Sequence, residues 1–392
     1  MTLICRFTPF DTWFFRESRP QGSIGSSELG SVFPPPLRTL LGAVRTAIGD
    51  AWHARHGTNW RQFAQLAELQ ALIGHADNLG NLRCRGPWLV KGEQRLYPAP
   101  ATLMIKDSIC FSLGLGDPVH CDLGRLHLPA FPERVAGLDN LAGAKPLGQC
   151  WLTAAGWQAV LAGRAPTPEQ IVPASALFHE EPRLGIGRDN ARSAVSHGLL
   201  YQTRHLRLLD DVAVELQLDG LADAALEPLN LPERQVIRLG GEGRQACLSL
   251  QRSQADTDLT PPGLPDSSPL LLYTLTPMPC AAGMPAGIPA GFQASQRNGI
   301  DVWEGEIACI GVRILSVACG RPLREGGWDM ANHQSRPVQS LLPAGSALFV
   351  EALDGNPASL LALHNLICGP DAALGRGQLL LGRLPNLSTS GN

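Results

Sequence analysis

The chain has 392 residues, 44% of them hydrophobic and 17% charged, and a formal net charge of −3 at pH 7. This length exceeds a single small core and predicts two domains, and the composition excludes a disordered chain. Because the charge is nearly balanced, any site for an anion such as nucleic acid must be local or completed by another subunit.

Ten cysteines are scattered along the chain without a CxxC pair, and neither they nor the histidines have zinc-site spacing. We therefore expect no metal and no cofactor, and isolated thiols are typical of a reducing cytosol. The start of the sequence lacks the pattern of a signal peptide, and no apolar run reaches the ~18 residues of a membrane span. The sequence predicts a cytoplasmic protein that does not contact a membrane.

The N-terminal part begins with a strand in "TLICRFTPFDTWFFR", followed by a glycine-serine loop, "GSIGSSELGS". A helix is predicted in "PPPLRTLLGAVRTAIGDAW", with Pro36 at its first position and an apolar stripe at helical spacing. A second helix is expected from about Asn59 to Gly74. "LRCRGPWLVKGEQRLYPAP" then predicts a strand pair, and "LTAAGWQAVLAG" a short helix capped by Thr153.

Further along, "VAVELQLDGL" alternates apolar and polar residues and predicts a half-buried strand. "RQVIRLGGEGRQACLSLQ" predicts a hairpin with "GGEG" at its tip. The linker-like stretch "ADTDLTPPGLPDSSP" suggests a domain boundary, which gives domains 1–255 and 256–392. Beyond it we expect strands in "LLLYTLTP", "IACIGVRILSVACG" and "LPAGSALFVEAL", and a short helix in "LHNLICG". Each half could be a strand-plus-helix unit of the α+β class.

One stretch of unusual composition, "GIGRDNARSAVSHGLLYQTRHLRL" from Gly185, gathers arginines with Asp189 as its only acid. Arginines with an interleaved aromatic are typical of sites that hold single-stranded nucleic acid. "LLYQTRHLRL" has the character of one hairpin arm, with "GIGRDNARSAVSHG" as the tip. The alternative is a solvated loop. The candidate RNA-contacting residues here are Arg188, Asn190, Arg192, His197, Tyr201 and Arg204.

The first predicted helix carries a second candidate surface, because its arginines and glycines fall on one stripe. Arginine forks bind phosphate, glycines let another backbone approach, and the helix start offers free N–H groups. Alternatively, the glycines allow tight packing and the arginines face water. The candidates on the helix are Arg38, Thr39, Gly42 and Arg45, with Arg16 and Arg19 in the loop before it.

Two further features are less specific. Gly375, Arg376 and Gly377 form a glycine-rich turn that could cradle a phosphate, although it lacks the ending of a nucleotide-binding P-loop. His53 and His56 could act as acid and base in RNA cleavage, but surface histidines at a helix end are the simpler interpretation. No other set of nucleophile and base stands out, so we expect no catalytic residues.

Several motifs, taken in order, resemble a known family. They are "FTPFDTWFFRESRP", the glycine-serine loop, "FPPPLRTLLGAVRTAIG", "EPRLGIGRDNARSAVSHGLLYQTRHLRL", "LGGEGR", "GGWDMA" and "LPAGS". In this order they resemble the RAMP proteins of CRISPR systems and, more narrowly, subunit three of the type III-B Cmr effector complex, which belongs to the Cas5 group. The matching motifs span about residues 7 to 346.

The resemblance implies an α+β fold of two ferredoxin-like, RRM-like domains with insertions and a β-hairpin thumb at about 183–208. It implies a non-catalytic subunit that holds the repeat-derived 5′ handle of the guide crRNA. The implied protein partners are the large polymerase/cyclase-like subunit and the adjacent backbone subunit, and target RNA is reached only indirectly. Two alternatives stay open. One is an endoribonuclease that processes precursor crRNA through His53 or His56, and the other is a protein-only scaffold.

Overall fold

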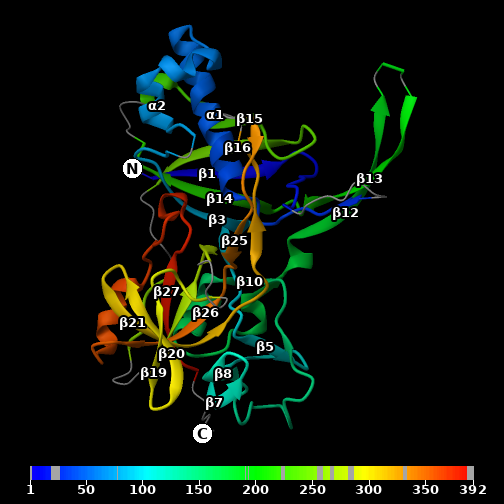
Figure 1. Ribbon diagram of the computed structural model, residues 1–392. Coiled ribbons are helices and arrows are strands. Elements are labelled where there is room, and N and C mark those ends of the chain that lie inside the picture. The colour runs from blue at the N-terminus through cyan, green and yellow to red at the C-terminus, as the bar shows by residue number, and fades with distance from the viewer. Residues whose placement is uncertain are drawn as a thin grey trace. The chain divides into compact units, whose positions relative to one another are not determined.

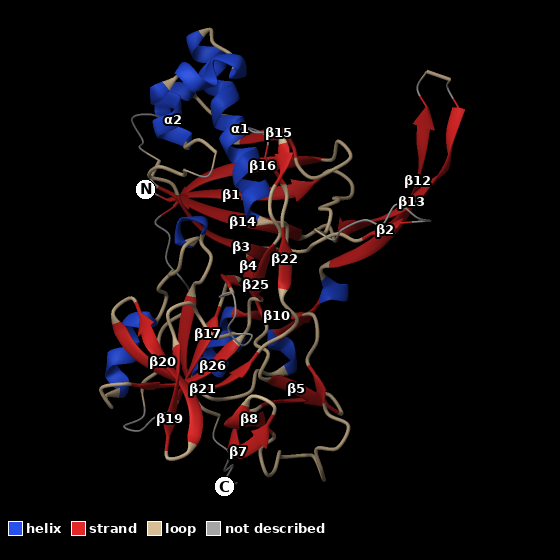
Figure 2. Cartoon of the chain, viewed as in Figure 1, coloured by secondary structure: helices blue, strands red, loops and turns tan. Residues whose placement is uncertain are grey.

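The computed structural model describes residues 2–18, 27–76, 78–189, 191–192, 194–221, 226–253, 259–264, 269–280, 287–329 and 333–385. These residues are mostly in strands, with few helices (Figure 2). The chain forms two compact units whose segments interleave along the sequence. Unit 1 comprises 1–94, 175–255 and 324–339, and unit 2 comprises 95–174, 256–323 and 340–392. The division into domains 1–255 and 256–392 stays a prediction.

Unit 1 is built on an antiparallel sheet, whose strands lie in the order β3 (Arg83–Lys91), β14 (Val212–Asp219), β1 (Thr2–Pro9), β16 (Gln245–Ser253) and β15 (Arg234–Arg238). The hairpin β15–β16 is the one predicted from sequence. The prediction for β14 was wrong, because residues Val212 to Leu218 are all buried. Strand β14 lies inside the sheet, between β1 and β3, and the side chain of Arg6 from β1 reaches over to Glu215 at 3.7 Å.

The α-helices of unit 1 lie in the sequence just before β3. Helix α1 (Leu37–His56; Figure 1) starts one residue later than predicted, with Pro36 as its N-cap. It buries the expected apolar stripe except for Trp52, which is half-buried. The predicted second helix is divided into a 3-10 turn, Trp60–Gln65, and α2 (Ala67–Ile73). Asn59 begins the first of these with a capping box, in which its side chain accepts a hydrogen bond from the backbone N–H of Arg61.

A long hairpin of β12 (Phe178–Asp189) and β13 (Ala194–Leu208) extends away from the sheet of unit 1 (Figure 1). We call residues 178–208 the arm. It includes the predicted thumb and begins earlier than expected, because "EEPRLGI" pairs with "LLYQTRHL" over most of its length. The short strand β2 (Ser27–Leu29) joins β13 in parallel. The remaining strands of unit 1 are β22 (Leu323–Glu325), β23 (Trp328–Asp329) and β24 (Gln334–Ser335).

Unit 2 has its own antiparallel sheet, in the order β19 (Gln293–Arg297), β20 (Ile300–Ile307), β21 (Ile310–Ala318), β26 (Ala347–Ala352), β17 (Leu270–Thr274) and β27 (Leu379–Arg383). Strand β17 lies inside the sheet, between β26 and β27, and is fully buried, as its apolar sequence indicates. Leu270 and Leu272 of β17, with leucines of β26 and β27, belong to the core of the unit, to which β20 and β21 also contribute.

Shorter elements complete unit 2. Helix α3 (Ala154–Leu161) begins as predicted, with the Thr153 hydroxyl accepting a hydrogen bond from the Gly156 N–H at 3.2 Å. The helix expected in "LHNLICG" was wrong: a 3-10 helix lies just before it, at Pro357–Leu363. The other strands are β4 (Gln94–Pro98), β5 (Leu103–Lys106), β6 (Ile109–Ser112), β7 (Gly114–Cys121), β8 (Gly124–Ala130), β9 (Lys145–Pro146), β10 (Cys150–Thr153), β11 (Ile171–Pro173), β18 (Met278–Pro279) and β25 (Gln339–Leu342).

The fold is therefore α+β, and the ferredoxin-like topology of its halves stays a prediction. No helix in the described part of the chain is both long enough and apolar enough to span a membrane. Within the same residues, no group of three or more potential ligands is placed to hold a metal ion.

Candidate nucleic-acid interface

The base of the arm brings together segments that are distant in sequence. Ser27 and Leu29 of β2 pair with Tyr201 and Thr203 of β13. The Ser31 hydroxyl donates a hydrogen bond to the backbone carbonyl of Arg204 at 2.7 Å. The loop that contains Arg16 is therefore fastened along the arm, and Arg16 itself, which is exposed, pairs through its backbone with Ser31.

The start of α1 is linked to the same place. The ring of Phe33, shortly before the helix, packs against Phe178 at the first position of the arm, with ring centroids 4.5 Å apart. Two of the predicted surfaces, the first turn of α1 and the arginine-rich hairpin, thus converge near the base of the arm. The sequence alone gave no register for β2 and so no indication of this convergence.

On one face of the arm base, arginines are held by carboxylates. Asp11 lies 3.1 Å from Arg183, 2.9 Å from Arg207 and 3.0 Å from Arg244. Glu181 contacts two of the same arginines, at 2.6 Å from Arg183 and 2.7 Å from Arg207. Partial desolvation raises the pKa of Asp11, but hydrogen bonds from Arg183 and Arg207 outweigh it and lower that pKa to about 2. Both carboxylates are therefore ionised at neutral pH, and this cluster is a fixed ion-pair network.

Arg204 occupies the other face of the hairpin and is also paired. Its guanidinium contacts Glu28 of β2 closely and lies 2.8 Å from Glu180 of β12. A phosphate that approached Arg204 would have to compete with two carboxylates. A sequence signal for this pairing was available: Glu180 and Glu181 directly precede the arginine-rich stretch, and in a hairpin they fall opposite Leu206 and His205.

His205 links the base of the arm to the segments around Thr12 and Glu242. It is fully buried, and its ring stacks on Phe14 with centroids 5.2 Å apart. Nδ1 lies 3.0 Å from the Thr12 hydroxyl, and Nε2 lies 3.2 Å from the Glu242 carboxylate. Since an ionised carboxylate only accepts, Nε2–H donates to Glu242 and Nδ1 accepts from Thr12. Burial, and then the nearby Arg183 and Arg244 cations, lower the pKa of His205, although Glu242 acts in the opposite direction.

The outer half of the arm differs from its base. Leu184 (74% exposed), Ile186 (55%) and Leu200 (48%) lie on one face, and Ile186 pairs directly with Leu200. On the opposite face, the ring of Tyr201 covers Gly185, where an added Cβ would lie only 2.2 Å from the ring. The arm therefore has an apolar outer face and an aromatic one.

The remaining predicted arm residues are placed only in part. Arg192 is exposed near the turn of the hairpin. Arg188 and His197 belong to the two strands, but their side chains lie outside the described part of the structure. Asn190 and Arg19 lie outside the described residues altogether.

Within α1, the arginine and glycine candidates recur every three or four residues and so share one side of the helix. Arg38, Thr39, Gly42 and Arg45 are all half-buried, and Arg45 Nη1 donates a hydrogen bond to the Ala76 carbonyl at 3.4 Å. The space around Gly42 is open, which keeps this side of the helix accessible. Gly49, by contrast, is covered by the ring of Trp60, so the glycine stripe serves packing at that end.

The glycine-rich turn in unit 2 is tightly packed. Arg376 is only 4% exposed, and its guanidinium lies 2.5 Å from Asp371. Gly375 adopts a left-handed conformation at the end of the 3-10 helix Ala372–Leu374, and Gly377 lies against the Cys368 carbonyl. The arrangement is typical of a structural turn, and the Arg376 guanidinium is not available for phosphate.

The two histidines considered for RNA cleavage do not form a reactive pair. His53 is buried, with Nδ1 2.7 Å from the Thr58 hydroxyl and its ring against Trp60. His56 is exposed, stacks on Trp52 and donates from Nδ1 to the Trp52 carbonyl at 2.9 Å. Only His56 could therefore meet a substrate.

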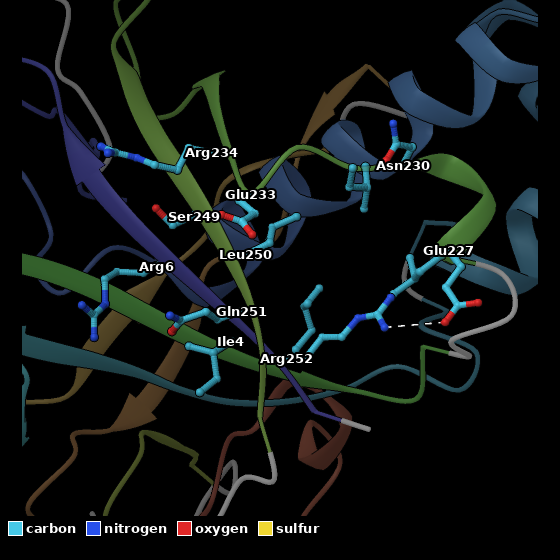
Figure 3. A pocket seen from close by; sticks show the side chains of 13 residues that line it. Ile4, Arg6, Glu227, Asn230, Glu233, Arg234, Ser249, Leu250, Gln251 and Arg252 are labelled. Carbon is cyan, nitrogen blue, oxygen red and sulfur yellow. Dashed lines mark ion pairs between the residues drawn. The ribbon is translucent and has the colours of Figure 1, made fainter.

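A pocket of about 660 Å³ lies in unit 1 between β1, β16 and the segment that precedes β15 (Figure 3). Figure 3 shows Arg252 reaching toward Glu227, at 3.7 Å, on one side of it. Its described lining includes Arg6, Arg234 and Glu233 but no histidine or cysteine.

Comparisons with known proteins place these features in a family. No curated protein matches the chain. A cryo-EM structure of the type III-B Cmr-beta complex bound to cognate target RNA contains a chain that is 14% identical, with a TM-score of 0.48 over 89% of this chain and 86% of that one. A crystal structure of the Csm3–Csm4 subcomplex of the type III-A interference complex contains one that is 9% identical, with a TM-score of 0.35 over 91% and 94%. The family model of the CRISPR-associated protein Cas_Cmr3 matches residues 5–384, so the chain belongs to this family.

Proposed function

We propose that the protein is a non-catalytic RNA-binding subunit of a type III-B CRISPR effector complex, where it holds the 5′ handle of the guide crRNA. Family membership supports the complex. The observation that carries the RNA-binding role is the arm, a hairpin with a base fixed by ion pairs and an outer half that extends from the sheet. Ordering a hairpin of this length costs conformational entropy, and the arm has no core of its own to offset that cost. Contacts with another molecule would offset it.

The RNA side of the proposal uses cations that reach the surface. Arg16, in the loop fastened to the arm, and Arg192, near its turn, are exposed. Tyr201 offers a ring face for stacking, and Arg38 and Arg45 flank the open Gly42 on α1. Arg204 is a weaker candidate, because Glu28 and Glu180 already occupy its guanidinium. The net charge of −3 fits a groove that is shared with neighbouring subunits.

The protein side of the proposal uses the apolar face of the arm. Leu184, Ile186 and Leu200 together expose an aliphatic surface that stays in water unless a partner covers it. We assign this face to the adjacent backbone subunit of the complex. In this proposal the large polymerase/cyclase-like subunit also docks on the protein. Target RNA is reached only indirectly, through its pairing with the guide.

The test is equilibrium binding of the handle RNA as a function of salt. Arg16→Ala combined with Arg192→Ala should weaken binding and reduce the slope of log K against log salt by roughly 0.7 for each phosphate that is no longer neutralised. Arg134→Ala, an exposed arginine of unit 2 for which the described structure gives no ion pair, is the matched control. Unchanged affinity and slope in the double variant would contradict the RNA assignment.

The two alternatives make different predictions. An endoribonuclease would cleave repeat RNA without metal, and His56→Ala would abolish the cleavage, since His53 is buried. A protein-only scaffold would assemble normally but form no crosslink to any handle nucleotide. The exposed Arg16 and Arg192 favour the RNA-binding subunit over both.

A further inference from the structure

A small hairpin in unit 1 lies against the first loop of the chain. Strands β23 and β24 pair Trp328 with Ser335 and Asp329 with Gln334. Just before them, the backbone N–H of Gly326 donates a hydrogen bond to the Ser18 hydroxyl at 2.8 Å. Ser18 lies two positions after Arg16, so residues more than 300 positions apart in sequence are joined.

This hairpin exposes its large apolar side chain and buries its charged one, the reverse of the usual arrangement. The indole of Trp328 is 57% exposed, whereas the carboxylate of the next residue, Asp329, is only 6% exposed. Arg336 pairs with Asp329 at 3.4 Å, and its backbone N–H donates to the Gly327 carbonyl at 2.9 Å. Adjacent strand residues point to opposite sides, so the ion pair that holds the buried Asp329 side chain inward fixes the ring outward. Folding alone favours the reverse, with the indole inside and the carboxylate in water.

The surroundings indicate which ligand the ring would meet. Exposed neighbours in the hairpin are polar, namely His333, Gln334 and Ser335, and Val338 (52% exposed) is an isolated aliphatic residue further along. Arg16 and Arg324 are exposed, and no ion pair with another described residue holds either of them. Arg324 lies four positions before Trp328, and the Gly326–Ser18 hydrogen bond joins the segment before the hairpin to the loop of Arg16. An exposed aromatic ring combined with accessible arginines is typical of single-stranded nucleic-acid sites, whereas a protein-docking surface is a contiguous apolar patch.

We propose that Trp328 is a stacking platform for one unpaired base of the bound guide RNA, with Arg16 and Arg324 neutralising the phosphates on either side. The Asp329–Arg336 ion pair positions the platform and does not touch the RNA. This inference rests on the proposed RNA-binding function and adds a subsite to it. Stacking needs a base but is tolerant of its identity, so the contact would secure the strand without reading its sequence.

The test is a double-mutant cycle in the reconstituted effector complex. A labelled guide RNA, and a series in which each handle nucleotide in turn is abasic, are bound to complexes that contain wild-type or Trp328→Ala protein. Trp328→Ala should weaken binding of the intact guide about 5- to 100-fold. At one handle position the abasic RNA should bind wild type and variant equally, because the missing base has already removed the stack.

Controls separate stacking from folding and from partner binding. Trp328→Phe should retain most of the affinity, and Val338→Ala should have no effect. An equal loss for every abasic RNA, or loss of assembly with a protein subunit instead of RNA, would overturn the inference. If the Arg16 and Arg192 variants weaken RNA binding while Trp328→Ala does not, the platform fails and the proposed function stands. If neither weakens it, both fail.

Discussion

Replacing Asp11 by Asn tests the ion-pair network at the arm base, because this change keeps the shape of the side chain and removes only its charge. Asp11 is about half-exposed, so each of its pairs with Arg183, Arg207 and Arg244 contributes at most about 1 kcal/mol in a solvent-screened setting. Allowing for residual hydrogen bonding by the amide, we expect a local loss of about 1–2 kcal/mol.

The assay is native-state amide exchange, since it measures the arm base apart from the rest of the chain. The reporters are the amides of Trp13 and Leu206, which bond to each other's carbonyls at 2.9 and 2.8 Å. Their protection should fall about 5- to 30-fold in Asp11→Asn. The exposed Asp122→Asn is the control and should change nothing.

The pH dependence has a defined sign. The pKa of Asp11 is lowered from 3.8 to about 2, so its stabilisation is complete above 3.8 and is lost as the pH falls through about 2. The advantage of wild type over Asp11→Asn should therefore vanish in strong acid, and high salt should reduce it as well. Undiminished protection in Asp11→Asn at neutral pH would refute the view that this carboxylate holds the arm.

Three further predictions concern other parts of the fold. His205 is buried in its neutral form, and its pKa is lowered from 6.5. Below pH 6.5 the unfolded segment takes up a proton that the folded one does not, so protection of the arm-base amides should decrease, and His205→Gln should remove that dependence. A wild-type protection profile that is flat from pH 7.5 to 5.5 would contradict the buried neutral ring. Gly220→Ala should cost at least about 2 kcal/mol in urea unfolding, because the new Cβ would lie 1.9 Å from a backbone carbonyl at a positive φ, whereas Gly57→Ala, also at a positive φ but in open space, should cost about 1 kcal/mol. Asp371→Asn should destabilise unit 2 by about 3 kcal/mol, because it leaves the Arg376 cation buried without its carboxylate, and a loss below 1 kcal/mol in thermal unfolding would show that the turn tolerates the unpaired charge.

Local patterns in the sequence predicted local structure well. The capped start of α3 at Thr153, the β15–β16 hairpin and the buried strand β17 follow from the caps, turn residues and hydrophobicity of a few consecutive residues. The burial of β14 could not be predicted in this way. Its alternating polar residues suggested a wet face, and only the strand order places Arg6 over Glu215.

The electrostatics of the candidate site could be predicted only in part. The arginine-rich hairpin was recognisable, and so were Glu180 and Glu181 beside it, but two of the carboxylates that neutralise it, those of Asp11 and Glu28, lie far upstream of the stretch. Pairing between residues so distant depends on the tertiary fold. The same is true of Arg376, which a glycine-rich turn made a candidate for phosphate and which the structure buries against Asp371.

The proposed hold on the crRNA handle is tested most directly by photo-crosslinking the assembled effector complex with a reactive nucleotide at each handle position, followed by peptide mapping. We expect crosslinks to the arm, within residues 185–207, and to the start of α1, within 33–49. Crosslinks that map only to other subunits would contradict this role, and the protein would then be a scaffold whose arm contacts protein alone.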